Sequence, residues 1–468
     1  MKKKTDFLKR FSELAAQQPK TLKVPNEFSK KSKKFKTQKT PLGSSGVPSD
    51  FELTHEFSTA CDLMENTRHH FYVTGNAGTG KSTLLHYFKE KTQKKIVVLA
   101  PTGIAAINIG GATIHSFFRF PTRLITEDDI KKIRGKADLF AALDTMIIDE
   151  VSMVRADMMD AIDASLRINR NRPHDPFGGV QMVFIGDLFQ LPPVVERDLE
   201  EYFEDHYLTP YFFSAKVFSE IRLQKIELQR VFRHIDPEFI LLLNKVRNNE
   251  LDMSDLRKIN QRYHASLKFH KHDLVITLTS TNALASAINL QKLSALPSKE
   301  YYFDAVVDGD FDEKSQPTDK KLRLRQGAQV MMVKNDPNKR WVNGTLGVIE
   351  HLTPEAIRVS FDHAVHTIDP SIWEKSVYEY DRTHGSIESV VTGSFRQYPI
   401  KLAWAITIHK SQGKTFDKVI IDLGYGAFAH GQAYVALSRC KSFEGLHLKA
   451  PLKYFDIILD QRVRDFHT

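Results

Sequence analysis

The most informative segment of the chain is residues 75–82, which read Gly75-Asn76-Ala77-Gly78-Thr79-Gly80-Lys81-Ser82. It follows the apolar run Phe71-Tyr72-Val73 and precedes a segment, residues 83–88, that favours a helix. It fits the pattern G-x-x-x-x-G-K-[ST], in which glycines let backbone N–H groups close around phosphate oxygens at the start of a helix. Lys81 can neutralise the β- and γ-phosphates, and the Ser82 hydroxyl can hold Mg²⁺. The stretch therefore predicts a nucleotide-binding α/β domain.

Short apolar strands alternate with loops and helical segments downstream of this loop. Apolar runs at residues 96–99, 146–148 and 180–185 are each followed by a loop. Continuous apolar strands that alternate with helices are typical of a parallel sheet covered on both faces. The same signature returns at residues 274–278 and 419–422. We therefore expect two α/β lobes, each built on a parallel sheet.

The sequence between residues 300 and 398 differs from both lobes. Strand-like runs at 328–333, 345–349 and 357–361 are separated by the turn signals Asn335-Asp336-Pro337-Asn338 and Asn343-Gly344. We interpret this region as a small β-barrel inserted in the second lobe. The expected domains are a basic disordered tail (1–48), a first lobe (49–220), a second lobe (221–299 and 399–468) and the barrel (300–398).

Composition narrows the class of protein. The chain has 468 residues, of which 41% are hydrophobic and 26% charged, which excludes a wholly disordered or fibrous chain. Two cysteines, Cys61 and Cys440, cannot form a disulfide framework and fit a reducing compartment. No run approaches the roughly 20 apolar residues that span a bilayer. We expect an intracellular protein without a membrane partner.

The net charge of +9 is concentrated in the tail. Residues 1–50 carry 13 basic and 4 acidic side chains, whereas the remaining chain is balanced. The tail serves either as a solubilising extension or, through the run Lys30-Lys31-Ser32-Lys33-Lys34, as a nucleic-acid tether or localisation signal. A nucleic-acid site in the folded body must therefore be argued from motifs.

Polar side chains end two further strands. Asp149 and Glu150 follow the apolar residues 145–148, at the edge of the sheet where the phosphate loop lies. We expect Asp149 to hold Mg²⁺ together with Ser82, and Glu150 to act as the base for attack on the γ-phosphate. Gln190 follows another buried strand, where its amide can sense the γ-phosphate.

Several motifs, taken together in their order along the chain, resemble those of one family, the Pif (petite integration frequency) helicases of superfamily 1B. The resemblance covers about residues 51–466. It rests on Ala100–Ala106 and Gly111–Phe118, on the signature Pro176–Gln181, on Leu228–Arg233 and Asn343–Gly347, and on Trp404–Gly413 and Tyr434–Arg439. The signature separates the family from other superfamily 1 branches. The resemblance implies two RecA-like lobes with a small Src-homology-like β-barrel in the second, and a strand-separating wedge at about residues 118–138.

The resemblance also implies the roles of further residues. Arg233 and Arg439 become cationic γ-phosphate contacts from the second lobe, joining Lys81, Asp149, Glu150 and Gln190. ATP binding is carried by the loop from Gly75 to Ser82 together with Thr83, Gln412 and Gly413. The residues implied to bind DNA are Pro101, Thr102, Gly103, Thr113, His115, Phe117, Asn343, Thr407, His409, Lys410 and Ser411.

Two positions depart from the family pattern. Leu53-Thr54-His55-Glu56-Phe57 lacks the glutamine that often reads adenine, which leaves base specificity open. His234 follows Arg233 where the family commonly has glutamine.

The resemblance implies an ATP- and Mg²⁺-dependent DNA helicase that moves 5′-to-3′ on single strands and acts on forks, R-loops or G-quadruplexes. Its implied partners are single-stranded and forked DNA and RNA–DNA hybrids, and we expect a monomer in solution. A bacterial chain would lie in the cytoplasm with the nucleoid, and a eukaryotic one in the nucleus or mitochondrion. Two alternatives are a RecD-like recombination helicase and a DNA-stimulated ATPase that remodels a protein partner without unwinding.

Overall fold

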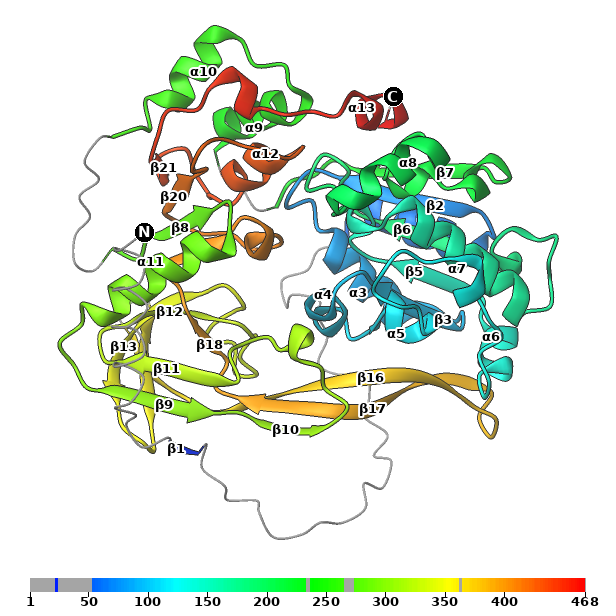
Figure 1. Ribbon diagram of the computed structural model, residues 1–468, viewed down its shortest axis with the longest axis horizontal. Helices are drawn as coiled ribbons and strands as arrows, with labels where there is room; N and C mark the ends of the chain where they lie inside the picture. Colours follow the sequence, from blue (N-terminus) through cyan, green and yellow to red (C-terminus); the bar gives the residue numbers. More distant parts are fainter. Residues whose placement is uncertain (1–21, 24–52, 233–235, 265–272, 362–363, 468) are drawn as a thin grey trace.

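The computed structural model describes residues 22–23, 53–232, 236–264, 273–361 and 364–467. Two α/β lobes and a β-rich insert are visible in Figure 1. Of the predicted tail, only Leu22–Lys23 lies within the described residues. These two residues form β1, which pairs in parallel with Phe303–Asp304 of β9. The prediction of a tail without structure is wrong for this pair, because β9 has a free edge that an extended segment can join.

The first lobe holds a six-stranded parallel sheet in the order β4-β3-β5-β6-β2-β7. Its strands are β2 (His70–Gly75), β3 (Ile96–Ala100), β4 (Ala112–Thr113), β5 (Thr145–Ile148), β6 (Gln181–Ile185) and β7 (Leu223–Leu228). The central strands β5 and β6 are buried at every residue, as their continuous apolar sequence predicts. Because β7 pairs with β2, this sheet extends past residue 220, where we expected the lobe to end.

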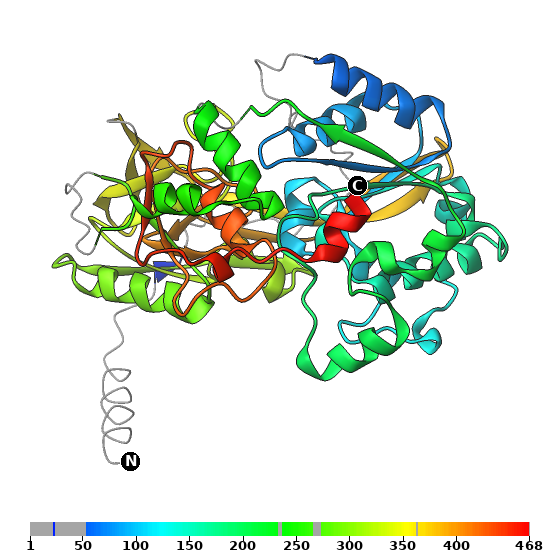
Figure 2. The same ribbon diagram turned by 90° about the horizontal axis from the view of Figure 1, so that it is seen from above.

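Helices cover both faces of this sheet, as Figures 1 and 2 show. They are α2 (His55–Asn66), α3 (Lys81–Lys91), α4 (Gly103–Asn108), α5 (Ile114–Phe118), α6 (Ala137–Ala142), α7 (Ala156–Asn169) and α8 (Glu200–His206). The segment expected to hold a strand-separating wedge lies between α5 and α6. There Arg123 and Asp129 form an ion pair at 2.7 Å, while Ile125 and Ile133 are buried in the core. The wedge role stays a prediction.

The second lobe holds a four-stranded parallel sheet in the order β19-β8-β20-β21. Its strands are β8 (Ile276–Thr279), β19 (Ala405–Thr407), β20 (Val419–Asp422) and β21 (Leu446–Leu448). Its helices are α9 (Pro237–Asn248), α10 (Met253–Asn260), α11 (Asn282–Ser294), α12 (Gln432–Leu437) and α13 (Gln461–His467). The expected fold of two lobes with parallel sheets is confirmed. In the described part of the chain, every helix is too short or too polar to cross a bilayer.

The insert contains a five-stranded antiparallel sheet in the order β15-β14-β13-β12-β18. These strands are β12 (Gln329–Met332), β13 (Leu346–Leu352), β14 (Ile357–Phe361), β15 (Ala364–Ile368) and β18 (Ile400–Leu402). A second antiparallel group pairs β9 (Glu300–Asp304) with β11 (Lys321–Arg325). Since β18 pairs with β12, the insert extends past the expected boundary at residue 398. Closure of these strands into a barrel stays a prediction.

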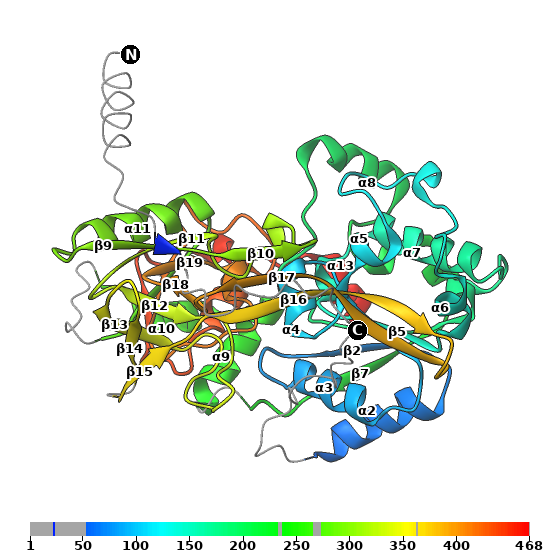
Figure 3. The ribbon, with the colours of Figure 1, turned by 90° about the horizontal axis from the view of Figure 1, so that it is seen from below.

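A long hairpin leaves the insert and was absent from our sequence analysis. It consists of β16 (Ser371–Asp381) and β17 (Ser386–Gln397), and β10 (Val306–Gly309) pairs with its base. Figures 1 and 3 show the hairpin running beneath the first lobe. Near its tip, Tyr378 is buried and its hydroxyl contacts the backbone N and O of Val98 in β3 at 3.2 and 3.3 Å. The hairpin thus joins the insert to the first lobe.

Candidate nucleotide-binding site between the two lobes

The predicted phosphate loop connects β2 to α3 at the carboxyl edge of the first sheet. Gly75 and Gly80 have φ angles of 148° and 83°, which side chains rarely adopt. A Cβ atom on Gly75 would lie 2.4 Å from the carbonyl oxygen of Leu228, and one on Gly80 would lie 2.8 Å from Cζ of Phe57. Glycine is therefore required at both positions by the backbone and by the neighbouring strand and helix.

Lys81 begins α3 and turns its amine into the loop. Its Nζ donates hydrogen bonds to the carbonyl oxygens of Gly75 at 2.6 Å and Asn76 at 3.1 Å. Its charge also acts on two buried carboxyl groups: it opposes the rise in the pKa of Asp149 and contributes to the lowered pKa of Asp187. Ser82 follows at the exposed start of the same helix. The structure therefore brings Lys81, Ser82 and Asp149 to one edge of the sheet.

The two acidic residues after β5 have different surroundings. Asp149 is buried, and this burial, with the charge of Glu150, raises the pKa of the Asp149 carboxyl well above its ordinary value. Glu150 is half-buried and has left-handed backbone angles of φ 51° and ψ 42°. Such angles are uncommon for a residue with a side chain and often occur at functional sites. The turn directs the two neighbouring carboxylates into separate environments.

Gln190 and Gln412 join the lobes across the cleft. Gln190 is buried, and its Nε2 donates to Oδ2 of Asp187 at 3.0 Å. From the second lobe, Nε2 of Gln412 lies 3.1 Å from Oε1 of Gln190 and 3.4 Å from Oε2 of Glu150. One amide from the second lobe thus contacts two predicted catalytic residues of the first.

Asp187 and Arg247 also belong to this cleft, although our sequence analysis gave neither a role. Arg247 comes from α9, and its Nη2 lies 3.4 Å from Oδ1 of Asp187. Its guanidinium stacks 3.8 Å from the ring centre of Phe189. Burial raises the pKa of Asp187, but the charges of Arg247 and Lys81 outweigh it and lower the pKa overall. Asp187 lies two residues after the buried strand β6, a strand-end position that could have marked it, whereas no local signal marks Arg247.

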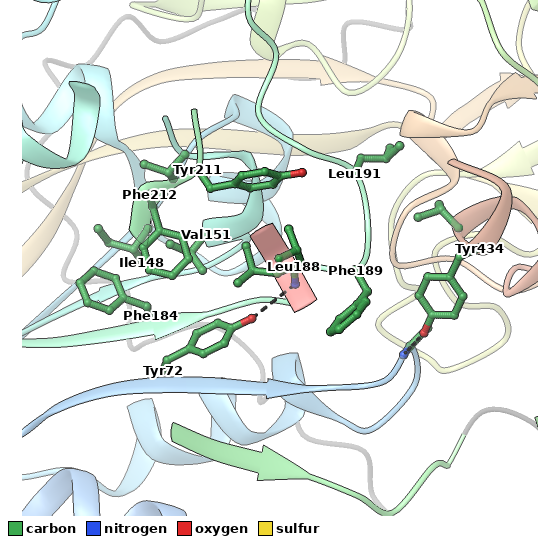
Figure 4. Close-up of a cluster of buried hydrophobic side chains, with 14 of the residues drawn as sticks. Tyr72, Ile148, Val151, Phe184, Leu188, Phe189, Leu191, Tyr211, Phe212 and Tyr434 are labelled. Atoms are coloured by element: carbon green, nitrogen blue, oxygen red, sulfur yellow. Dashed lines mark hydrogen bonds between the residues drawn. The ribbon is translucent and has the colours of Figure 1, made fainter. Parts of the chain in front are cut away.

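The second lobe also contacts the phosphate loop directly, as Figure 4 shows for Tyr434. The backbone N–H of Ala77 donates to the Tyr434 hydroxyl at 3.1 Å, and the Asn76 amide donates to Oδ1 of Asn244 at 2.9 Å. Burial raises the pKa of Tyr434 to about 12, so its phenol is neutral at physiological pH. The cleft here is lined by Asn76, Ala77, Val231, Ile240, Leu243, Asn244, Tyr434 and Ser438.

The structure describes only one of the two arginines that we expected to contact the γ-phosphate. Arg233 lies outside the described residues, although the adjacent Phe232 donates its N–H to the Gly78 carbonyl at 2.9 Å. Arg439 is 1% exposed. Its guanidinium contacts the carbonyl oxygens of Val435 and Lys414 and the hydroxyl of Ser438. In this arrangement Arg439 supports its own lobe, and its contact with the γ-phosphate stays a prediction.

Among the residues expected to bind DNA, those of the first lobe are partly structural. Thr102 and Thr113 are N-caps of α4 and α5, accepting hydrogen bonds from Ala105 and Ser116. Phe117 lies in the core: its ring is 1% exposed and packs on Phe118, Phe140 and Tyr378, and its contact with DNA stays a prediction.

The second-lobe members of this set are also partly structural. Thr407 and Ser411 are buried, with hydroxyls bonded to the Lys410 N–H and the Ile408 carbonyl, and their contact with DNA stays a prediction. Lys410 is exposed and His409 half-buried. Asn343, in the insert, is half-buried. Pro101, Gly103 and His115 are half-buried, and burial lowers the pKa of His115.

The signature at residues 176–181 lies away from this cleft. Gln181 begins β6, and its Oε1 accepts hydrogen bonds from Thr145 at 2.7 Å and Lys94 at 2.8 Å. Phe177 is buried, and its N–H bonds to Asp163. These contacts hold the amino edge of the sheet, opposite the phosphate loop. The signature at residues 176–181 therefore has a structural role in this fold.

Comparisons with known proteins agree with this geometry. The PIF1-like helicase family matches residues 53–257, and the 2B domain of DNA helicase Pif1 matches residues 313–352. The chain is 32% identical to the ATP-dependent DNA helicase Pif1 of Bdellovibrio bacteriovorus, over 89% of this chain and 92% of that protein.

Solved structures of a Pif1 from Bacteroides sp are similar as well. The complex with ADP-AlF4 has a TM-score of 0.83 at 39% identity, covering 89% of this chain and 97% of that one. The same protein bound to single-stranded DNA has a TM-score of 0.64 at the same identity and coverage. The lobe arrangement described above is therefore more similar to that of the complex without DNA.

Proposed function

Because this chain belongs to the PIF1-like helicase family, we propose that it is an ATP-dependent DNA helicase that moves 5′-to-3′ along single-stranded DNA. The observation that carries the proposal is the bridge from Gln412 to Glu150 and Gln190, which links the second lobe to the hydrolysis site of the first. A change at the γ-phosphate position therefore changes a contact between the lobes. Repeated opening and closing of this cleft would advance one lobe and then the other along a strand.

The residues of the site take the following roles. Lys81 and the loop amides bind the phosphates, and Glu150 accepts the proton of the attacking water. Gln190 positions the water or the γ-phosphate, and Arg233 and Arg439 reach the phosphates when the lobes close. Ser82 in the first turn of α3 and Asp149 directly after β5 offer oxygen ligands of the kind that Mg²⁺ prefers. When bound there, Mg²⁺ would neutralise phosphate charge.

The proposed substrates are single-stranded and forked DNA, extending to R-loops, RNA–DNA hybrids and G-quadruplexes. The proposed state in solution is a monomer, and the proposed location is the nucleoid of a bacterium, or the nucleus or mitochondrion of a eukaryote. Family membership disfavours the RecD-like alternative. The other alternative is an ATPase that remodels a protein partner and does not unwind DNA. The following experiment would distinguish it from a helicase.

The test is unwinding of two partial duplexes, one with a 5′ and one with a 3′ single-stranded tail, with ATP and Mg²⁺. We expect product only from the 5′-tailed duplex, and none with Glu150→Gln, because that variant lacks the proposed base. Unwinding of only the 3′-tailed duplex would reject the polarity. DNA-stimulated ATPase activity without unwinding of either duplex would reject the helicase function.

A further inference from the structure

A histidine of the second lobe contacts the loop that carries Gln190. His430 lies between β20 and α12 and is 6% exposed. Its Nε2 lies 2.8 Å from the carbonyl oxygen of Leu188 in the first lobe. Its Nδ1 accepts a hydrogen bond from the backbone N–H of Asp460 at 2.9 Å. Because Nδ1 is an acceptor, the ring proton lies on Nε2, and His430 donates it to the Leu188 carbonyl.

The surroundings of His430 suit a neutral ring in one fixed orientation. Burial lowers the pKa of His430, although the charges of Asp460 and Asp187 oppose this effect. A protonated ring would turn Nδ1 into a donor that faces the Asp460 N–H. The ring also packs edge-on against Tyr211 of the first lobe, with ring centres 6.2 Å apart. Groups from both lobes therefore hold the imidazole in place.

The loop that carries Gln190 is held on two sides. On the first-lobe side, the Leu188 N–H donates to the Tyr72 hydroxyl at 3.4 Å, as Figure 4 shows. On the second-lobe side, a Cβ atom on Gly431 would lie 2.3 Å from the carbonyl oxygen of Phe189 and 2.5 Å from that of Gln190. There is no room for a side chain at position 431, so the backbone of the second lobe rests directly on this loop.

The same segment of the second lobe also contacts the phosphate loop. Helix α12 begins directly after Gly431, and its Tyr434 accepts a hydrogen bond from the Ala77 N–H at 3.1 Å. The segment 430–434 thus contacts both the loop that carries Gln190 and the loop that binds phosphates. A shift of α12 relative to the first lobe would therefore move the Leu188 carbonyl and, with it, the amide of Gln190.

We propose that His430 is a positioning residue for ATP hydrolysis: it holds the Leu188 carbonyl and thereby keeps Gln190 directed at the γ-phosphate. The inference rests on the proposed function and adds a residue to which the sequence analysis gave no role. His430 touches no nucleotide itself and acts through Leu188 and Gln190. Its loss lowers kcat and changes the KM for ATP little, because the phosphate loop still binds the nucleotide.

The experiment measures steady-state ATP hydrolysis by the full chain, with saturating oligothymidylate, for three substitutions of His430. His430→Gln can place an amide N–H near the position of Nε2 and so keep the bond to Leu188. His430→Met has a similar length but no donor, and His430→Asn can keep only the bond from Asp460. We expect a kcat close to wild type for His430→Gln, and a kcat lower by about 10-fold or more for the other two, with little change in KM.

His70→Ala is the matched control for the loss of a histidine that bonds the backbone. His70 begins β2, away from the nucleotide cleft, is half-buried, and its Nδ1 accepts from the Met182 N–H at 3.0 Å. We expect this variant to keep the wild-type kcat even if its melting temperature falls. A purely structural role of His430 would instead make kcat follow the melting temperature in all variants.

A double variant tests whether His430 acts through Gln190. Adding His430→Met to Gln190→Ala should lower kcat no further than Gln190→Ala alone, because the group that His430 positions is already absent. Additive losses, or equal losses in the three His430 variants, or a wild-type kcat in all three, would overturn the proposal. If His430→Met and His430→Asn do not fold, a folded His430→Gln with a kcat far below wild type would also overturn it. Absence of DNA-stimulated hydrolysis in the wild type would reject the proposed function instead.

Discussion

At the phosphate loop, one lysine both completes the local structure and supplies the charge for chemistry. Lys81 bonds two loop carbonyls and acts electrostatically on Asp149 and Asp187. The DNA-contact candidates lie on other elements, around Lys410 and Asn343. We therefore predict that single substitutions can separate the binding of nucleotide phosphate from the binding of DNA.

Lys81→Ala should abolish ATP hydrolysis while leaving binding of single-stranded DNA mostly intact. The reason is that the variant removes the charge facing the β- and γ-phosphates but touches no DNA-contact candidate. Hydrolysis is measured by phosphate release and binding by fluorescence anisotropy, with thermal melting as the control for folding. Loss of both activities in a folded variant would show that the two sites are not separate.

Lys414 gives a prediction about pH. Its pKa falls from 10.5 in the unfolded chain to about 8 in the fold, so the folded chain holds the proton less tightly. The unfavourable contribution of the buried charge is present below pH 8 and disappears as the pH rises toward 10.5. Lys401 from β18 and Asn343 from the insert face this amine.

Lys414→Gln should therefore raise the free energy of unfolding by about 1–2 kcal/mol at pH 7, and the gain should shrink by pH 10. Urea unfolding of both proteins at the two pH values measures it. A gain that grows with pH would contradict the sign of the pKa shift.

At the scale of elements, the hairpin β16–β17 completes an edge that the first sheet leaves open. The partner strand β4 pairs only with Leu99 and Ala100 of β3, so no strand of the described residues lies on that side of the preceding part of β3. Tyr378 offers Val98 a hydroxyl that both donates and accepts. At the hairpin tip, Arg382 forms an ion pair with Asp138 of α6. A segment of the insert thus substitutes for part of a strand.

Tyr378→Phe should lower the free energy of unfolding by about 1–3 kcal/mol, because the buried N–H and carbonyl of Val98 lose their partner while the ring packing remains. Denaturant unfolding measures the change. Tyr425→Phe is a suitable control, since Tyr425 is fully exposed on the second lobe. Equal stability of wild type and Tyr378→Phe would show that water replaces the hydroxyl.

At the scale of the whole molecule, segments distant in sequence tie the lobes together. Helix α13 ends the second lobe but packs on the first, where Phe466 stacks on Phe213 with ring centres 4.2 Å apart. Lys225 of β7 donates to the His467 carbonyl at 2.7 Å. These contacts, and those of the hairpin with the first lobe, add to the contacts between the lobes at the nucleotide cleft; Figures 1 and 2 show α13 beside the first lobe. Opening of the cleft must strain or release one of them.

Removal of residues 1–48 should lower affinity for single-stranded DNA mainly at low salt, if the tail tethers nucleic acid. The tail is rich in lysine, and the attraction of exposed charges to phosphate is screened as salt increases. Binding of oligothymidylate over a salt series compares the full and shortened chains. An unchanged salt slope would leave the tail as a solubilising extension.

Features of this protein that depend on near neighbours along the chain could be predicted from the amino-acid sequence. The phosphate loop, the acidic pair after β5 and most strands of both sheets are confirmed as elements because apolar runs, glycines and strand-end polar residues are local signals. The hairpin was missed because its strands β16 and β17 are mostly half-exposed, so they lack a continuous apolar run.

The residues that complete the site from distant parts of the chain became apparent from the three-dimensional packing. Arg247 meets Asp187, Tyr434 meets Ala77 and Lys414 meets Asn343, in each case between segments at least 60 residues apart in the chain. The packing also places Phe117 in the core. The physical reason is that burial and pairing depend on how the lobes and the insert pack together, and no local pattern of residue types encodes that packing.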